Sequence, residues 1–243
     1  MQSLSIGLYF ISNQNNNMKH SYEVEIKSLL GSKDNAELLK NNLKKLYPGT
    51  RLISKGKQLN HYFISPKDFS AIENNFAKYI PEDKQSTFKN ILEHGQKISI
   101  RTRDADGKVI LVIKASVGDD TSSNGVKRIE FESIVPLKLG ELDQLLIDSG
   151  CSYQAKWSRE REEYSSGDMH VCIDKNAGYG YLAEFEKVTD DEGFLDNIRT
   201  LLLEEMKKLG VLELPQDRLE RMFAHYNANW EKYYGTDNIF NIE

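Results

Sequence analysis

The chain has 243 residues, of which 39% are hydrophobic and 28% charged, as in a soluble globular protein large enough for one sizeable core. Its net charge of −5 speaks against a general binder of nucleic acid or anionic membranes, since such proteins usually carry a basic surplus. The two cysteines have neither CxxC nor zinc spacing, and no stretch reaches the roughly 20 apolar residues of a membrane helix. No signal peptide is recognisable. We therefore expect a cytoplasmic protein with reduced thiols.

Residues 1–20 are expected to be a flexible extension, and residues 21–243 a single domain. The extension contains the polar run NQNNN, and Met18 after it is placed like a natural start just before the first charged strand. No linker, repeat or low-complexity segment divides the remainder of the chain.

The first half of the chain predicts alternating strands and helices. SYEVEIKSLL, at 21–30, has the two-residue period of a strand. A helix follows, capped by Ser32 or Asp34 and ended by Pro-Gly after Leu46. A short strand is expected at 58–65, and two helical stretches are expected within 66–95.

The second half predicts mostly hairpin-linked strands. Strands are expected at 97–104, 108–117, 126–135, 152–164, 169–174 and 180–188, with an Asp-Gly turn between the first two. A helix ends before Gly150, and two helices end the chain at 191–210 and 215–235. Eight antiparallel strands favour a closed barrel, because closure removes exposed strand edges. The predicted fold is α+β: an eight-stranded antiparallel β-barrel, or tunnel, with helices packed outside and at the C-terminus.

Charged side chains recur on one face of these strands. In the first strand Glu23, Glu25 and Lys27 lie opposite Val24 and Ile26. Pairs of bases recur in the later strands at Arg101 and Arg103 and at Arg159 and Arg161. Pairs of acids recur at Glu130 and Glu132, which follow Arg128 on the same face, and at Glu184 and Glu186.

Two interpretations compete for this charged face. The first is the solvated face of a sheet that packs its other face on helices, which is the usual explanation for one strand. It explains poorly the pairs of like charge two residues apart, because like charges on neighbouring positions destabilise a sheet. The second interpretation is a ligand site, in which carboxylates bind a divalent metal ion and basic groups bind phosphate. The recurrence over several strands favours a metal–polyphosphate complex.

The ordered set of motifs resembles the CYTH superfamily of triphosphate tunnel metalloenzymes, which includes class IV adenylyl cyclases, thiamine triphosphatases and inorganic triphosphatases. The set begins with Glu23-x-Glu25-x-Lys27 and ends with Gly178-x-Gly180 leading into Glu184-x-Glu186, so the resemblance runs from about Tyr22 to Val188. ExExK alone is a weak motif, whereas the ordered set is specific.

The resemblance implies a role for each matching residue. The metal ligands implied are Glu23, Glu25, Glu130, Glu132, Asp174, Glu184 and Glu186. The groups implied to bind the triphosphate are Lys27, Arg101, Arg103, Lys114, Arg128, Arg159 and Arg161. The catalytic set implied is Glu23, Glu25, Lys27 and Glu184, and the cofactor is Mg²⁺ or Mn²⁺, with two ions bound. In the charged segment SREREEY, either Arg159 or Arg161 can be the phosphate contact.

We expect a metal-dependent triphosphatase acting on inorganic triphosphate, thiamine triphosphate or a nucleoside triphosphate. The alternatives are a class IV-type adenylyl cyclase, which forms cyclic AMP and pyrophosphate from ATP, and a polyphosphate- or nucleotide-binding module without turnover. The expected partner is a small-molecule triphosphate, with no nucleic acid and no membrane, and the expected assembly is a monomer or a homodimer.

Several features stay outside the predicted site. His170 and Cys172 share the parity of Asp174 and either fill space or contact the ligand. Asp119 and Asp120 are expected to be solvated loop residues. The aromatic residues of the last helix either form core or plug one mouth of the tunnel, and the former is favoured. Tyr179 is expected to affect the packing of its turn.

Overall fold

A computed structural model of the chain describes residues 5–10, 20–116, 128–189 and 191–242. Its contacts divide the chain into two compact units, unit 1 with Met1–Gly56 and Arg159–Glu243 and unit 2 with Lys57–Ser158. The predicted loop aspartates Asp119 and Asp120, and Met18, lie outside the described residues. Whether the two units form one domain, as the sequence predicted, stays a prediction.

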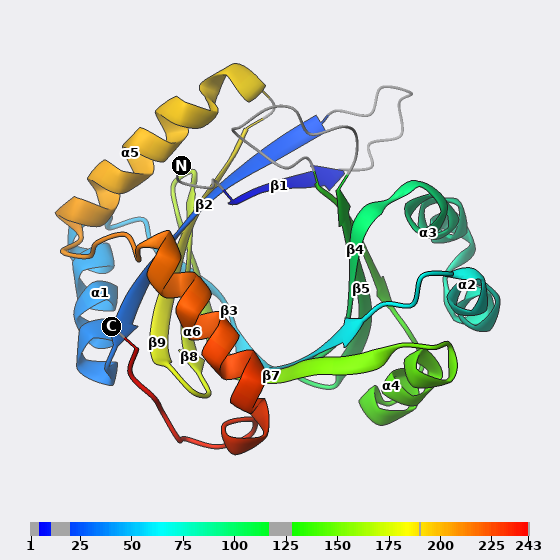
Figure 1. The fold of residues 1–243 in the computed structure, drawn as a ribbon. Helices are drawn as coiled ribbons and strands as arrows, with labels where there is room; N and C mark the ends of the chain where they lie inside the picture. The colour runs from blue at the N-terminus through cyan, green and yellow to red at the C-terminus, as the bar shows by residue number, and fades with distance from the viewer. Residues whose placement is uncertain (1–4, 11–19, 117–127, 190, 243) are drawn as a thin grey trace. The chain divides into compact units, whose positions relative to one another are not determined.

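The elements follow the predicted order (Figure 1). The strands are β1 Ser5–Phe10, β2 His20–Gly31, β3 Arg51–Ile64, β4 Gln96–Ala105, β5 Lys108–Ser116, β6 Arg128–Ile134, β7 Ser152–Ser166, β8 Met169–Asn176 and β9 Gly180–Thr189. The α-helices are α1 Lys33–Leu46, α2 Ser70–Phe76, α3 Glu82–His94, α4 Leu139–Asp148, α5 Leu195–Lys208 and α6 Gln216–Asn229. Short 3₁₀ turns lie at Ala77–Tyr79, Glu192–Phe194 and Trp230–Lys232.

All eight predicted strands are present, as β2 to β9, and the α+β class is confirmed. Strand β1 is an addition, because Ser5–Phe10 falls within the predicted flexible extension and yet pairs antiparallel with β2. Its segment SIGLYF is apolar enough for a strand, but it precedes a polar run that indicated a tail.

The sheet of unit 1 has the strand order β1-β2-β9-β8-β7-β3. Helices α1 and α5 cover one face of β2 and β9 (Figure 1). The side chains of Val24, Ile26 and Phe185 point to this helical layer and are fully buried or nearly so. Because residues alternate between the faces of a strand, Glu25, Lys27 and Glu184 belong to the opposite face.

Helix α1 begins where the sequence predicted it. Ser32 is the N-cap, and its Oγ accepts a hydrogen bond from the backbone N–H of Asn35 at 3.2 Å. Ala36, Leu39 and Leu43 form the buried stripe of the helix at the spacing of three to four residues. They pack against β2 and β9, so this local signal helps fix the strands that carry the first charged motif.

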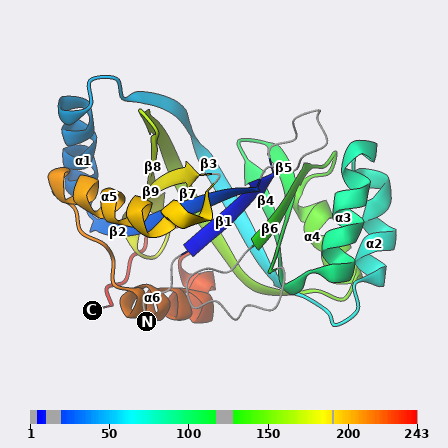
Figure 2. The same cartoon turned by 90° about the horizontal axis from the view of Figure 1, so that it is seen from above.

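In unit 2 the strand order is β7-β3-β4-β5-β6, and helices α2, α3 and α4 lie on one side of β4, β5 and β6 (Figure 2). Phe131 of β6 packs on Phe88 of α3 with ring centroids 5.4 Å apart, so the predicted insertion at 66–95 supplies core to this unit. The β4–β5 turn is the predicted Asp-Gly hairpin. Asp106 and Gly107 have φ values of 50° and 85°, as a type I′ turn requires.

The C-terminal aromatic residues cover the turn that leads into β9. Tyr226 of α6 is fully buried, and its ring lies 6.3 Å from that of Tyr179. The backbone of Gly178 pairs with the segment around Ile239 through two hydrogen bonds, to Asn238 and from Phe240. The burial of Tyr226 agrees with core packing, which was the favoured interpretation of these aromatic residues. Tyr179 takes part in the packing of its turn, as expected.

Gly178 is where this packing demands a glycine. Its φ is +90°, and a Cβ atom there would lie 2.6 Å from the Tyr226 ring. We expect Gly178→Ala to lower the free energy of unfolding by about 2–4 kcal/mol, because backbone strain and a steric clash add. The matched control is Gly167→Ala, at φ +67° with nothing within 4 Å, which should cost about 1–2 kcal/mol. Urea unfolding of both variants measures the difference, and equal losses would contradict this account.

Candidate active site

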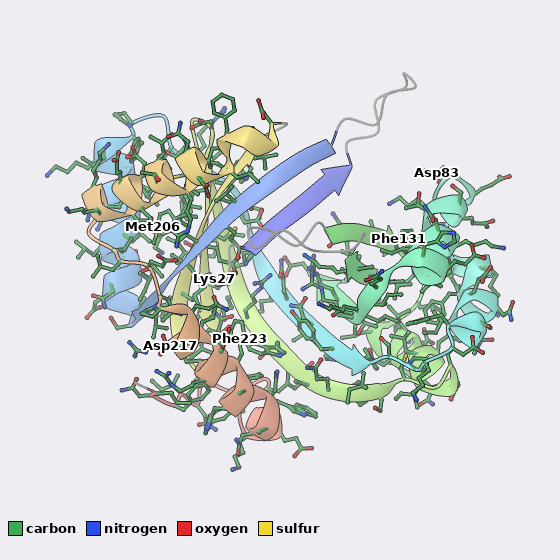
Figure 3. The ribbon with its side chains drawn as sticks, turned by 45° about the horizontal axis from the view of Figure 1, so that its top comes forward. Lys27, Asp83, Phe131, Met206, Asp217 and Phe223 are labelled. Atoms are coloured by element: carbon green, nitrogen blue, oxygen red, sulfur yellow. The ribbon has the colours of Figure 1, made fainter. Side chains whose placement is uncertain are left out.

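The charged residues of unit 1 form cross-strand rows on the face away from α1 and α5. In the register of β2 and β9, Glu25 lies opposite Glu186 and Lys27 lies opposite Glu184. On the other side of β9, Glu184 lies opposite Cys172 of β8. Figure 3 labels Lys27 in β2 and Met206 of α5, which is buried in the core on the opposite face.

Lys27 and Arg161 link these acids into one network. Lys27 forms a close ion pair with Glu25, and its Nζ lies 3.5 Å from Glu184 Oε1. Arg161 of β7 donates a hydrogen bond to the other oxygen of Glu184. The four side chains therefore alternate in charge, Glu25, Lys27, Glu184 and Arg161, over three strands of one face. This arrangement offsets the repulsion between like charges that the sequence pattern alone implied.

Asp174 is the most deeply buried member of the site, with 1% of its side chain exposed. Arg161 donates to both of its oxygens, from Nε and from a terminal nitrogen, each at 2.7 Å. Arg159 donates to Oδ2 at 3.0 Å. The predicted role of Asp174 as a metal ligand stays a prediction, and in this structure its carboxylate is engaged by the two arginines.

The two arginines of SREREEY are thus distinguished. Arg161 binds Asp174 through two nitrogens and also binds Glu184, so its charge is offset by two carboxylates. Arg159 donates to Asp174 in the same network, and its charge also lowers the pKa of Glu184. Arg161 therefore joins β7 to β8 and β9 through two carboxylates.

The protonation states follow from these contacts. Burial raises the pKa of Glu184, but the nearby cations Lys27, Arg161 and Arg159 outweigh it and hold the pKa well below its usual range. Burial raises the pKa of Cys172, which faces this site, to about 12 despite Arg161 beside it. At neutral pH Glu184 is therefore an anion and Cys172 a neutral thiol.

The other face of β7 carries a second cluster. Glu162 accepts hydrogen bonds from Lys55 at 2.7 Å, from the Tyr164 hydroxyl at 2.7 Å and from Lys40 of α1 at 3.1 Å. Burial raises the pKa of Glu162, yet these donors lower it to about 2. This cluster ties β7 to α1 and β3 directly behind Arg161, so it stabilises the strand that carries both arginines.

Unit 2 presents a row of basic residues on β4. Arg103 donates from Nε to Asn60 Oδ1 at 3.0 Å and from a terminal nitrogen to Glu132 of β6 at 3.1 Å. Arg101 donates to the Tyr62 hydroxyl at 3.0 Å. Lys114 is half-buried on β5, opposite Ser99 of β4 and Glu130 of β6.

Behind this row, a buried carboxylate ties β3 and β4 to α4. Asp143 accepts a hydrogen bond from Thr102 at 2.6 Å, lies 2.6 Å from His61 Nδ1 and accepts from the Tyr153 hydroxyl at 2.8 Å. Burial raises the pKa of Asp143, but these donors lower it below its usual range. His61 and Thr102 face each other in the β3–β4 register, so Asp143 fixes the alignment of the two strands.

Sequence analysis did not find Asn60, Tyr62 and Asp143. Asn60 and His61 lie between the apolar residues Leu59 and Phe63 in β3, and this was the available signal, because a buried polar side chain needs a partner. Of the predicted residues, Glu23, Arg128 and Glu130 lie in strands β2 and β6, but their side chains are not described. Glu186 lies opposite both Glu25 and His170.

The carboxylates of β2 and β9 suit a hard divalent metal ion in their chemistry. Glu25 and Glu186 stand directly opposite each other, and such a pair is stabilised by a cation between them. Among the side chains that the structure describes, no three Asp, Glu, His or Cys groups lie close enough together to hold a metal ion. Glu25 is instead engaged by Lys27, so a metal ion at this pair would compete with the ammonium group.

The fold and these charged rows define an α+β protein whose sheet carries acidic and basic side chains in cross-strand rows. The family model described as CYTH domain matches residues 85–218, which is more than half of the chain. The chain therefore belongs to the CYTH domain family, as its motifs predicted, and the family is generally dependent on divalent metal ions. The matched range includes β4 to β9 but not the ExExK motif of β2.

Solved structures share the fold at low sequence identity. A protein of Pyrococcus horikoshii aligns with a TM-score of 0.55 and 19% identity, covering 84% of this chain and 99% of that one. A candidate adenylate cyclase from Vibrio parahaemolyticus aligns with a TM-score of 0.54 and 16% identity, covering 83% of this chain and 97% of that one. A conserved protein of Pyrococcus furiosus aligns with a TM-score of 0.53 and 16% identity, covering 77% of this chain and 90% of that one. No curated protein matches the sequence.

These likenesses show the fold alone, and they agree with the predicted α+β class. Within the part of the chain that the structure describes, no helix is both long and apolar enough to cross a membrane.

Proposed function

We propose that this chain is a divalent-metal-dependent hydrolase of a small-molecule triphosphate. The observation that carries the proposal is the alternation of Glu25, Lys27, Glu184 and Arg161 on one sheet face, backed by a fully engaged Asp174. Such a face supplies both carboxylates for a cation and bases for phosphate oxygens. The basic row of unit 2, with Arg101 and Arg103, carries side chains that are themselves suited to phosphate oxygens.

Each residue has a role in this proposal. In unit 1, Lys27 and Arg159 neutralise phosphate oxygens and orient the chain of phosphates. In unit 2, Arg101, Arg103 and Lys114 are the basic groups suited to phosphate. Glu23, Glu25 and Glu186 would hold Mg²⁺ or Mn²⁺, which when bound polarises the phosphate and lowers the pKa of a coordinated water. Glu184 keeps Lys27 and Arg161 in place as an anion. Water attacks the terminal phosphorus, the P–O bond of the anhydride breaks, and orthophosphate leaves with the shortened polyphosphate.

A direct assay tests the proposal and its main alternative. The full chain is incubated with inorganic triphosphate, thiamine triphosphate or ATP and with Mg²⁺ or Mn²⁺, and ³¹P NMR identifies the products. We expect orthophosphate and the corresponding diphosphate product, one ¹⁸O atom in the orthophosphate when ¹⁸O-water is used, and no reaction with EDTA. Cyclic AMP and pyrophosphate from ATP would replace the proposal by the cyclase alternative. Absence of any product with both metals would leave the binding-module alternative.

A further inference from the structure

Strand β3 presents an acceptor to each arginine of the basic row in unit 2. In the β3–β4 register Asn60 lies directly opposite Arg103, and Tyr62 lies directly opposite Arg101. Each pair is joined by a hydrogen bond of 3.0 Å, from Arg103 Nε to Asn60 Oδ1 and from Arg101 to the Tyr62 hydroxyl. Because the two pairs are two residues apart, Asn60 and Tyr62 lie on the same face of the sheet as Arg101 and Arg103.

Asn60 is better suited than other partners to set the direction of Arg103. The guanidinium group is planar, so a hydrogen bond at Nε fixes the plane in which the two terminal nitrogens point. Asn60 is 4% exposed, so little solvent competes for its amide oxygen. Glu132, another partner of Arg103, has a side chain that is 42% exposed, and such a solvated ion pair exchanges readily.

The partner that fixes the plane is also electrically neutral. A carboxylate at position 60 would orient Arg103 and at the same time offset its charge, which would weaken its attraction for phosphate. An amide orients the guanidinium without adding a second negative charge to that of Glu132. The same reasoning applies to the Tyr62 phenol beside Arg101, whose guanidinium carbon lies 5.6 Å from the centroid of that ring.

We propose that Asn60 is a positioning residue that holds Arg103 in the orientation in which it binds a phosphate oxygen of the substrate. Tyr62 accepts from a terminal nitrogen of Arg101 and restrains that group through a neutral partner. The binding of phosphate by Arg103 rests on the proposed function, whereas the orientation of Arg103 by Asn60 can be measured without turnover. The strand that carries both residues is fixed from behind by the hydrogen bond between His61 and Asp143.

The test compares three variants of the full chain. Asn60→Ala removes the acceptor. Asn60→Asp keeps an acceptor but adds a negative charge. Asn75→Ala is the matched control, because Asn75 is another asparagine of unit 2 that is largely shielded from solvent. It lies on helix α2, and its amide donates to Ser149 Oγ at 2.9 Å. All three variants are checked for folding by circular dichroism and urea unfolding.

The first readout is the Nε–H signal of Arg103 in a ¹⁵N–¹H spectrum, assigned by its absence in Arg103→Lys. We expect Asn60→Ala to speed the solvent exchange of this signal, and Asn60→Asp and Asn75→Ala to leave it slow. The second readout is kinetic. Asn60→Ala should raise KM for inorganic triphosphate about tenfold with kcat nearly unchanged. Arg103 then loses the hydrogen bond that orients it, which weakens its binding to the ground state and to the transition state equally. Asn60→Asp should also raise KM, since its charge offsets that of Arg103.

The outcomes separate this inference from the proposed function. If no triphosphate is hydrolysed, calorimetric binding of inorganic triphosphate replaces KM, and weaker binding by Asn60→Ala together with the exchange result supports the inference alone. If the wild-type chain hydrolyses triphosphate and Asn60→Ala changes neither the Nε–H exchange nor KM, Asn60 has no positioning role and the inference is overturned. Equal effects of Asn60→Ala and Asn75→Ala on KM would also overturn it.

Discussion

Replacing Arg161 by methionine is expected to lower the free energy of unfolding by about 3–5 kcal/mol, because it leaves two carboxylates without their main partner. Asp174 is 1% exposed and loses two hydrogen bonds of 2.7 Å, while Glu184 loses the donor beside it. Arg159 remains as a donor to Asp174 Oδ2 but does not replace the Nε hydrogen bond of Arg161 to Oδ1. A buried anion that has lost its partner costs far more than an exposed one.

Urea unfolding followed by circular dichroism measures this effect, with Arg221→Met as the matched control. Arg221 pairs with Asp217 on the surface of α6, where both side chains are largely exposed, so its loss should cost less than about 1 kcal/mol. Adding Asp174→Asn to Arg161→Met should recover part of the stability, since the buried charge is then removed as well. A loss no larger than that of the surface control would show that the network contributes little to the fold.

Replacing Glu25 by glutamine is expected to lower kcat at least a hundredfold, on the order of the loss of one electrostatic group in an active site, with little change in stability. The amide keeps the size of the side chain and one oxygen but removes the charge that would bind a cation. The unfolding free energy should change by less than about 1 kcal/mol. The loss of the pair with Lys27 is offset by relief of repulsion against Glu186, which lies directly opposite.

The measurements are turnover with Mn²⁺ and the shift of the melting temperature that Mn²⁺ causes without substrate. We expect both to be lost in Glu25→Gln. Both should be retained in Glu37→Gln, since Glu37 lies on α1 with 51% of its side chain exposed and pairs with Lys40. Turnover and a melting shift that both survive Glu25→Gln would remove Glu25 from the metal site, whereas a lost melting shift with intact turnover would mean that the metal bound at Glu25 is not catalytic.

The strand period accounts for what the sequence predicted well. In β2 and β9 the apolar residues Val24, Ile26 and Phe185 are buried, and the charged residues between them share the other face. Two-residue alternation depends only on the backbone of one strand, so it can be inferred without knowing its neighbours. Turn chemistry is equally local, and the Asp106–Gly107 hairpin has the expected φ values.

The partners of each charge could not be predicted, because they depend on the register between strands far apart in the sequence. SREREEY does not reveal that Arg161 is bound by both Asp174 and Glu184, or that Arg159 donates to Asp174 as well. Nor does QLNHYF reveal that Asn60 faces Arg103. Strand β1 was missed for a different reason, since its pairing with β2 is a long-range event outside the recognised motif.

The division of the chain in sequence has a consequence for its synthesis. Unit 2 is one continuous stretch, Lys57–Ser158, so all of its strands and helices are available once that stretch has left the ribosome. Strand β2 is made early, but its neighbour β9 begins only at Gly180. Until then the apolar side of β2 is covered by α1 and lacks α5, and Glu25 and Lys27 lack Glu186 and Glu184. The charged row of the first motif is thus one of the last features of the nascent protein to assemble.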